Sequence, residues 1–141
     1  MSKQKTLLVV DGQGGGLGKN IIEKVRKAGI NLHIIAVGAN ALATAAMLKA
    51  GADEAATGEN AVVYNSQFAH YIMGGVGVIA ANSMLGEVTP AMAGAVASAN
   101  ALKLLIPVNR CLLFVAGVKD NGLGEKIDEA IAKIAESLEK N

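Results

Sequence analysis

The chain has 141 residues, a length typical of one domain, and we expect a single domain over residues 1–141. Its formal net charge of +1 gives no sign of a nucleic-acid-binding surface. It contains no run of about 20 consecutive apolar residues, the length that crosses a bilayer, so we expect no membrane span.

The cysteine and histidine content narrows the chemistry further. One cysteine, Cys111, excludes an internal disulfide and a cysteine-based zinc site. The two histidines lie far apart without metal-site spacing, and we predict no metal. The N-terminal MSKQK leads into only five apolar residues, too few for a signal peptide, so we expect a cytoplasmic protein.

The first half of the chain alternates between apolar runs and amphipathic segments. TLLVV at 6–10 and LHIIAVG at 32–38 predict buried strands. Residues 18–28 predict an amphipathic helix ended by Gly29, and 40–51 predict a helix with Asn40 as its N-cap. We expect a short third strand within ADEAAT and a helix over ENAVVYNSQF. This alternation favours parallel βαβ units.

The second half continues the pattern less regularly. Residues 70–75 predict a fourth strand, and 78–86 predict a helix ended by Gly86. Thr89 should cap a further helix that begins at Pro90. LKLLIPV and CLLFVAGV predict fifth and sixth strands, and the roughly four residues between them are too few for a parallel crossover. We therefore expect a Rossmann-like three-layer α/β sandwich, with a mostly parallel sheet of about six strands ending in an antiparallel hairpin. The amphipathic segment 122–140 should form a C-terminal helix.

The stretch DGQGGGLGKN, which follows the first strand, has five glycines between Gly12 and Gly18. Glycines in a turn between a strand and a helix allow backbone N–H groups to approach a phosphate, and the helix N-terminus adds partial positive charge. One glycine suffices for a tight turn. We therefore predict that the loop at 12–19 binds a phosphate-bearing ligand; a turn without a ligand is the alternative.

The glycine spacing agrees with one known loop. G-x-G-x-x-G fails because Leu17 stands where its third glycine belongs, whereas G-x-x-x-G-x-G matches Gly12, Gly16 and Gly18. The first 30 residues thus resemble the cofactor loop of short-chain dehydrogenases and reductases, which implies NAD(P) or another nucleotide. That family's Tyr-x-x-x-Lys pair is missing, and Asn40 stands near the place of its ribose-binding acid.

A phosphate loop of the G-x-x-x-x-G-K-[ST] type fits less well. Gly18 and Lys19 match its end, but Gln13 replaces the first glycine and Asn20 replaces the magnesium-binding hydroxyl. Phosphoryl transfer is therefore disfavoured, although Lys19 could neutralise a phosphate.

Further polar residues follow the predicted strands. Arg110 could bind a carboxylate or phosphate, or lie in solvent. Glu87 is a candidate base and Cys111 a candidate nucleophile, with a structural role as the alternative for each. The predicted binding residues are Gly12, Gly14, Gly15, Gly16, Leu17, Gly18, Lys19, Asn40, Asn82, Asn109 and Arg110.

Five segments resemble a family of short bacterial proteins of unknown function: VVDGQGGGLGK, ATAAMLKAGA, ATGENAVVYN, ANSMLGEVTPAMA and LIPVNRC. They span most of residues 9–111 and leave the last helix outside the resemblance. The family implies no activity.

Three functions remain open. The first is binding of a nucleotide or dinucleotide; the others are a small enzyme acting on a phosphorylated or carboxylated metabolite, and an oligomeric scaffold or sensor without catalysis. Between Asn60 and Leu102 only Glu87 is formally charged, which predicts a buried interface and hence a homo-oligomer.

Overall fold

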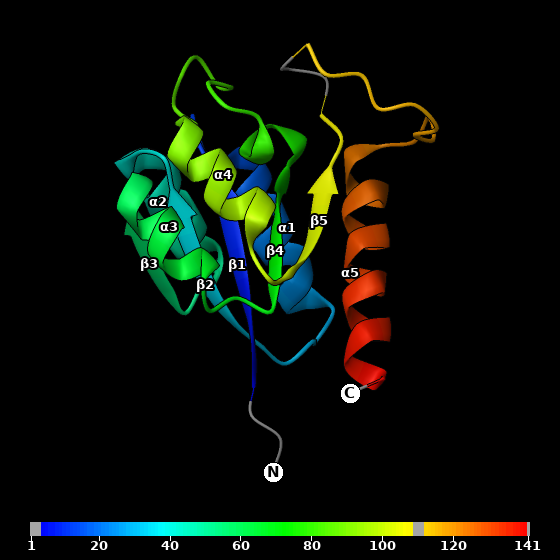
Figure 1. Cartoon of the computed structure of the whole chain (residues 1–141). Helices are drawn as coiled ribbons and strands as arrows, with labels where there is room; N and C mark the ends of the chain where they lie inside the picture. The colour runs from blue at the N-terminus through cyan, green and yellow to red at the C-terminus, as the bar shows by residue number, and fades with distance from the viewer. Residues whose placement is uncertain (1–3, 109–111, 141) are drawn as a thin grey trace.

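The computed structural model describes residues 4–108 and 112–140. Within these ranges five strands form one entirely parallel sheet in the order β3-β2-β1-β4-β5 (Figure 1). The strands are β1 (Lys5–Asp11), β2 (Leu32–Gly38), β3 (Glu54–Thr57), β4 (Tyr71–Gly75) and β5 (Leu102–Ile106). The central strand β1 pairs with β2 on one side and with β4 on the other. The direction in which successive strands are added to the sheet therefore reverses between β1 and β4.

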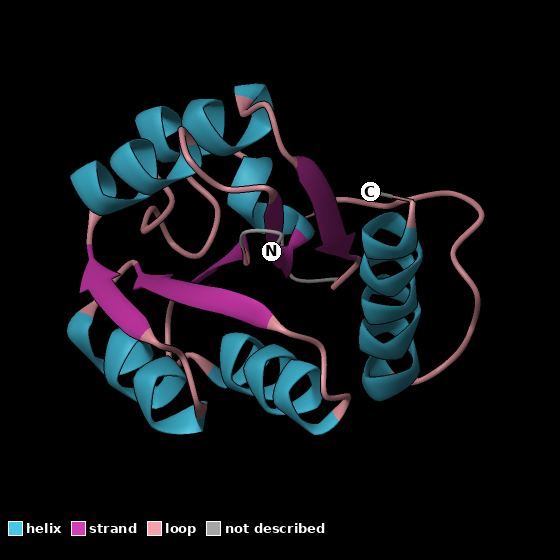
Figure 2. Ribbon diagram, turned by 90° about the horizontal axis from the view of Figure 1, so that it is seen from below, coloured by secondary structure: helices cyan, strands magenta, loops and turns pink. Residues whose placement is uncertain are grey.

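Helices cover both faces of this sheet (Figure 2). One face carries α1 (Gly16–Lys27), α2 (Ala41–Ala50) and α5 (Leu123–Glu139). The other carries α3 (Glu59–Ser66), α4 (Pro90–Ser98) and the short 3₁₀ helix η1 (Val76–Ile79). The protein is therefore a three-layer α/β sandwich of Rossmann-like topology, as the sequence predicts.

Two hydrophobic cores lie on the two faces, and β1 contributes to both. Leu7 and Val9 point into the core with α1, α2 and α5, whereas Leu8 and Val10 point into the core with α3 and α4. All four are buried. A strand covered on both faces has no solvent-facing position, which is why its sequence is a continuous apolar run.

Two expected helix caps are confirmed. The Asn40 side chain accepts a hydrogen bond from the Ala43 amide at 2.9 Å, and the Thr89 hydroxyl accepts one from the Met92 amide at 3.2 Å. Each satisfies one of the amides that a helix N-terminus leaves without an intrahelical partner.

The expected sixth strand and its antiparallel hairpin are not formed. Residues 112–118 are exposed and contain no strand, while position 111 lies outside the described residues. The reason is the position of α5, which begins at the carboxyl end of β5 (Figure 1). A seven-residue strand running back along β5 would extend about 23 Å away from that end. The four residues 119–122 would then have to lead back to the start of α5, but they span at most about 14 Å, which is too short.

The helix expected over residues 78–86 is also wrong. After η1 the chain forms successive turns, and Asn82, Met84 and Leu85 have φ values of 66°, 56° and 57°. This left-handed backbone cannot continue a right-handed helix. Local polar contacts favour the turns, because the Ser83 hydroxyl donates to the Gly77 carbonyl and the Ser83 carbonyl accepts from the Val88 amide. We call residues 80–88 the covering loop.

Candidate functional site

The glycine loop, residues 12–19, turns the chain from β1 into α1. The Gly15 amide donates to the Gly12 carbonyl at 2.9 Å, and the Lys19 amide donates to the Gly15 carbonyl at 2.9 Å. Gly15 is the N-cap of α1, with φ of 75°. The first hydrogen bond closes a tight turn, and the second starts the helix directly after it.

The buried carboxylate of Asp11, at the end of β1, binds two amides of this turn. One oxygen of Asp11 accepts from the Gly12 amide at 2.8 Å, and the other accepts from the Gly18 amide at 2.7 Å. The Asp11 residue is only 6% exposed. Because α1 has no capping side chain at Gly15, Asp11 serves its first turn from the end of the preceding strand.

Three of the five glycines, Gly12, Gly15 and Gly18, lie where a Cβ would come within 3.0 Å of other atoms of the protein. A Cβ on Gly15 would lie 2.8 Å from the Ala43 Cα, and the positive φ of Gly15 is unfavourable for other residues. A Cβ on Gly18 would collide with the Met47 side chain and lie 3.1 Å from the Asp11 Cβ. These glycines let α1 and α2 approach the loop closely.

Gly14 and Gly16 have no such explanation. A Cβ at either position would meet nothing within 4 Å among the described residues, and neither residue has a positive φ. The folded chain therefore does not require glycine at these positions. Close approach of another molecule to the backbone is a physical reason for glycine in such a place.

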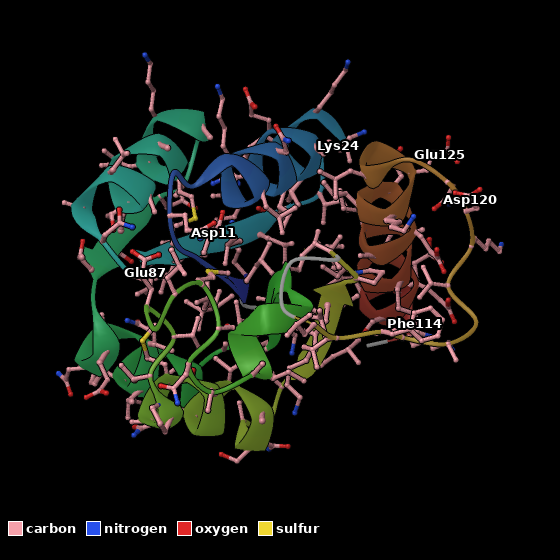
Figure 3. All side chains as sticks on the ribbon, turned by 90° about the horizontal axis from the view of Figure 1, so that it is seen from above. Asp11, Lys24, Glu87, Phe114, Asp120 and Glu125 are labelled. Carbon is pink, nitrogen blue, oxygen red and sulfur yellow. The ribbon has the colours of Figure 1, made fainter. Side chains whose placement is uncertain are left out.

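A cavity of about 340 Å³ opens beside these two glycines. It lies between the carboxyl ends of β1 and β4, the two strands at which the chain order reverses, where ligands bind in open α/β sheets. Figure 3 looks onto this end of the sheet. The lining residues are Asp11, Gly12, Gln13, Gly14, Gly15, Gly16, Leu17, Asn20, Gly77, Met84, Val108 and Leu123.

Backbone amides are the main donors that this cavity offers to an anion. Within the described parts of the chain, the amides of Gly14, Gly16 and Leu17 donate no hydrogen bond. Gly16 and Leu17 form the start of α1, where the aligned peptide dipoles give a partial positive charge. Lys19 is exposed and does not line the cavity, and the described lining contains no lysine or arginine.

On the side of β2, the glycine loop is covered. Glu87 accepts from the Gln13 amide at 2.6 Å through Oε1 and from Asn40 Nδ2 at 2.6 Å through Oε2. Asn40 Nδ2 also donates to the Gln13 carbonyl at 2.9 Å. A Cβ on Gly12 would lie 2.8 Å from Met84 Sδ. Glu87 and Met84 belong to the covering loop, which thus closes over the end of β2.

Of the remaining sequence candidates, one lies away from the cavity and three fall outside the described residues. Asn82 is exposed in the covering loop and does not line the cavity; its amide donates to the Val88 carbonyl at 2.6 Å. Asn109, Arg110 and Cys111 lie outside the described residues. The structure therefore gathers Gly12 to Leu17 at the cavity, with Gly18 buried below them and Asn40 beside them.

Sequence reasoning missed several residues of this site. Asp11 carried a usable signal, since a carboxylate between an apolar strand and a glycine-rich turn is well placed to bind loop amides. Asn20 lies one turn into α1 on the same side as Gly16, so helical spacing would have indicated it. Gly77 and Val108 follow the parallel strands β4 and β5, whose carboxyl ends share one edge of the sheet with that of β1, whereas no local pattern predicts that Met84 and Leu123 reach the same cavity.

The described residues contain neither a metal-binding cluster nor a membrane-spanning helix. No group of three or more His, Cys, Asp or Glu side chains is arranged to hold a metal ion. None of the described helices is both long and apolar enough to cross a bilayer.

A family model described as "Domain of unknown function (DUF3842)" matches residues 6–139. The chain belongs to this family. The resemblance to a family of unknown function is thereby confirmed, and its extent is corrected: the DUF3842 match includes α5, which the five resembling segments had left outside.

A search of curated proteins found no match to the chain. Among solved structures, the chain is similar to a dodecameric FMN-dependent UbiX-like decarboxylase from Escherichia coli O157:H7. The two share 14% sequence identity with a TM-score of 0.42, over 92% of this chain and 76% of the decarboxylase chain.

Proposed function

We propose that this protein binds a phosphate-bearing small molecule of mononucleotide size in the cavity between the glycine loop and β4. The observation that carries the proposal is the pair Gly14 and Gly16, which border the cavity and which the fold itself does not require. Glycine costs conformational entropy relative to alanine, about 0.5–1 kcal/mol in a helix, so its use at open positions needs a reason. A phosphate against the backbone supplies one.

The phosphate would accept hydrogen bonds from the amides of Gly14, Gly16 and Leu17. The partial positive charge at the N-terminus of α1 attracts the phosphate. The amides of Gly12 and Gly18 donate to Asp11 and are therefore not available to the ligand. The apolar part of the ligand would contact Leu17, Val108 and Leu123, which line the same cavity.

The size of the cavity favours a small ligand. Ligand cavities span roughly 300–1,000 Å³, and this one, at about 340 Å³, is near the lower limit. A dinucleotide would extend across the loop toward β2, where Glu87 and Met84 already lie. We therefore favour a mononucleotide over NAD(P), which would require the covering loop to move.

A catalytic function has less support. Glu87, the candidate base, is bound to Gln13 and Asn40 and does not line the cavity. We propose ligand binding and assign no reaction.

Isothermal titration calorimetry tests the proposal with inorganic phosphate, AMP, ATP, FMN and NAD. We expect at least one mononucleotide to bind, and the Gly16→Val variant to bind it at least about tenfold more weakly, because the new side chain occupies the phosphate position. Ala132→Val is a matched control, since it enlarges an exposed helical residue on α5. Failure of every ligand to bind, or equal affinity in the Gly16→Val protein, would contradict the proposal.

A further inference from the structure

The Glu87 carboxylate lies against the glycine loop in the manner of a bound anion. Its two oxygens accept hydrogen bonds from the Gln13 amide and from Asn40 Nδ2, both at 2.6 Å. Glu87 is half-buried, and within residues 4–108 and 112–140 no lysine or arginine forms an ion pair with it. A carboxylate held by N–H donors alone makes the contacts that a phosphate of a ligand would make in its place.

Gly12 makes room for this carboxylate at the loop backbone. A Cβ on Gly12 would lie 2.7 Å from Glu87 Oε1 and 2.8 Å from Met84 Sδ, and both atoms belong to the covering loop. The next atom, the Ala39 Cβ, would lie at 3.4 Å, an ordinary contact distance. The sheet and helices would therefore accept a larger residue at position 12, and it is the approach of an anionic side chain that requires glycine there.

The Glu87 contact lies beside the Gly14 amide, which donates no hydrogen bond among the described residues. Gln13 and Gly14 both line the cavity, as does Met84. Consecutive Cα atoms are about 3.8 Å apart, so anionic groups at these two amides would be close neighbours, as the two phosphates of a diphosphate are. One stretch of backbone thus offers two adjacent anion positions, and the protein's own carboxylate takes one of them.

The backbone on both sides of this contact is strained. Gln13 has a φ of 49°, and Met84 and Leu85 have φ values of 56° and 57°, in the left-handed region that is unfavourable for residues other than glycine. Leu85 is 99% exposed, so burial of its side chain does not offset the strain. Strained segments of this kind are typical of ligand clamps and switch regions. The covering loop should therefore open readily once the Glu87 contact is replaced.

We infer that Glu87 is an internal competitor for a second anion position in the cavity, and that the ligand which displaces it carries a diphosphate. This inference rests on the proposed function, because its first phosphate uses the amides already assigned to a phosphate. The second phosphate accepts from the Gln13 amide and Asn40 Nδ2 in place of Glu87, and the covering loop moves away from the end of β2. A monophosphate reaches only the first position and leaves Glu87 bound.

Amide chemical shifts of the ¹⁵N-labelled protein, titrated with inorganic phosphate and with inorganic pyrophosphate, test this inference. These probes carry no base, so the result does not depend on the choice of nucleoside. Both should cause saturable shifts of the amides of Gly14, Gly16 and Leu17. Only pyrophosphate should also shift the side-chain NH₂ signals of Asn40, because only pyrophosphate reaches the position of the Glu87 carboxylate.

The Glu87→Ala variant distinguishes a competitor from a structural brace. Removal of a competitor should raise the affinity for pyrophosphate at least about tenfold and that for phosphate less than about threefold, whereas removal of a brace should weaken the binding of both. Glu139→Ala is the control, since it removes the same charge from an exposed residue at the far end of α5, and both affinities should stay unchanged. Glu87→Gln keeps one hydrogen bond and should raise the pyrophosphate affinity by a smaller factor; it replaces Glu87→Ala if that variant does not fold.

Failure of this inference and failure of the proposed function give different results. Shifts of the glycine-loop amides with both probes but none at Asn40, or a pyrophosphate affinity that is unchanged or weaker without the Glu87 carboxylate, would overturn the inference and leave the proposed function in place. The absence of saturable shifts at the glycine loop with either probe would contradict both.

Discussion

Asp11 and Gly18 are joined by a buried hydrogen bond of 2.7 Å that ties the end of β1 to the first turn of α1. The second oxygen of Asp11 accepts the Gly12 amide at 2.8 Å, so one carboxylate fixes both ends of the glycine loop. The loop therefore has a defined shape, and the amides of Gly14, Gly16 and Leu17 are held ready before any ligand arrives.

Replacing Asp11 with asparagine should lower the free energy of unfolding by about 1–3 kcal/mol, because the amide group of asparagine turns an N–H donor toward a buried amide donor. Urea denaturation measures the change. Asp128→Asn is the matched control: its ion pair with Lys24, at 2.9 Å, is exposed and should contribute at most about 1 kcal/mol. Equal losses in the two variants would show that Asp11 does not hold the loop.

The glycines of the loop should separate into two classes when each is changed to alanine. Gly15→Ala should destabilise the protein by more than about 1 kcal/mol, because its Cβ meets the Ala43 backbone and its φ is positive. Gly14→Ala should leave thermal stability unchanged or slightly raised, since its Cβ meets open space. If Gly14→Ala is as damaging as Gly15→Ala, the fold itself requires both glycines.

Glu87→Gln should loosen the covering loop. Glu87 accepts the Gln13 amide with one oxygen and Asn40 Nδ2 with the other. Glutamine has a single side-chain oxygen, and its NH₂ group cannot accept, so one of these two hydrogen bonds is lost. Because the backbone of Met84 and Leu85 is left-handed, the loop depends on such contacts. Limited proteolysis within residues 80–88 should be faster than in the wild type or in Glu59→Gln, whose side-chain oxygen can still accept the single exposed hydrogen bond from the Thr89 hydroxyl. An unchanged cleavage rate would contradict this role of Glu87.

His70 should make stability depend on pH. Burial, followed by the positive charge of Lys5, lowers the pKa of His70 from its ordinary 6.5. Its Nδ1 accepts the Thr6 amide at 3.0 Å, a bond that the protonated ring cannot accept. As pH falls below about 6.5, the unfolded chain takes up a proton that the folded chain does not, so stability should fall until the folded pKa is reached.

The His70→Asn variant tests this dependence, because its side-chain oxygen can still accept the Thr6 amide and does not titrate. Denaturation curves between about pH 5 and pH 7 should show a smaller loss of stability in the variant than in the wild type. Parallel pH profiles of the two proteins would exclude a contribution from His70.

Local patterns predicted the layered fold well. TLLVV and LHIIAVG became β1 and β2, and Asn40 and Thr89 cap their helices. These outcomes depend on apolar spacing and on hydrogen bonds between residues three apart, which a sequence displays directly.

The errors came from segments whose conformation depends on distant parts of the chain. LLFVAGV has the composition of a strand, yet the start of α5 leaves no path for the return of that strand. Residues 78–86 have a helical pattern, but Glu87, which follows them, binds Gln13 and Asn40, 74 and 47 positions away in the sequence. Spacing likewise could not show that Gly15 and Gly18 are needed for packing whereas Gly14 and Gly16 are not.

A titration of the ¹⁵N-labelled protein with whichever of AMP, ATP and FMN binds in calorimetry, followed by amide chemical shifts, reports directly on the proposed phosphate position. We expect the amides of Gly14, Gly16 and Leu17 to show the largest saturable shifts, as expected for amides that donate hydrogen bonds to the phosphate, and the Gly16→Val variant to lose these shifts. An absence of saturable shifts at these three amides, or shifts confined to another surface, would contradict binding of a phosphate at the glycine loop.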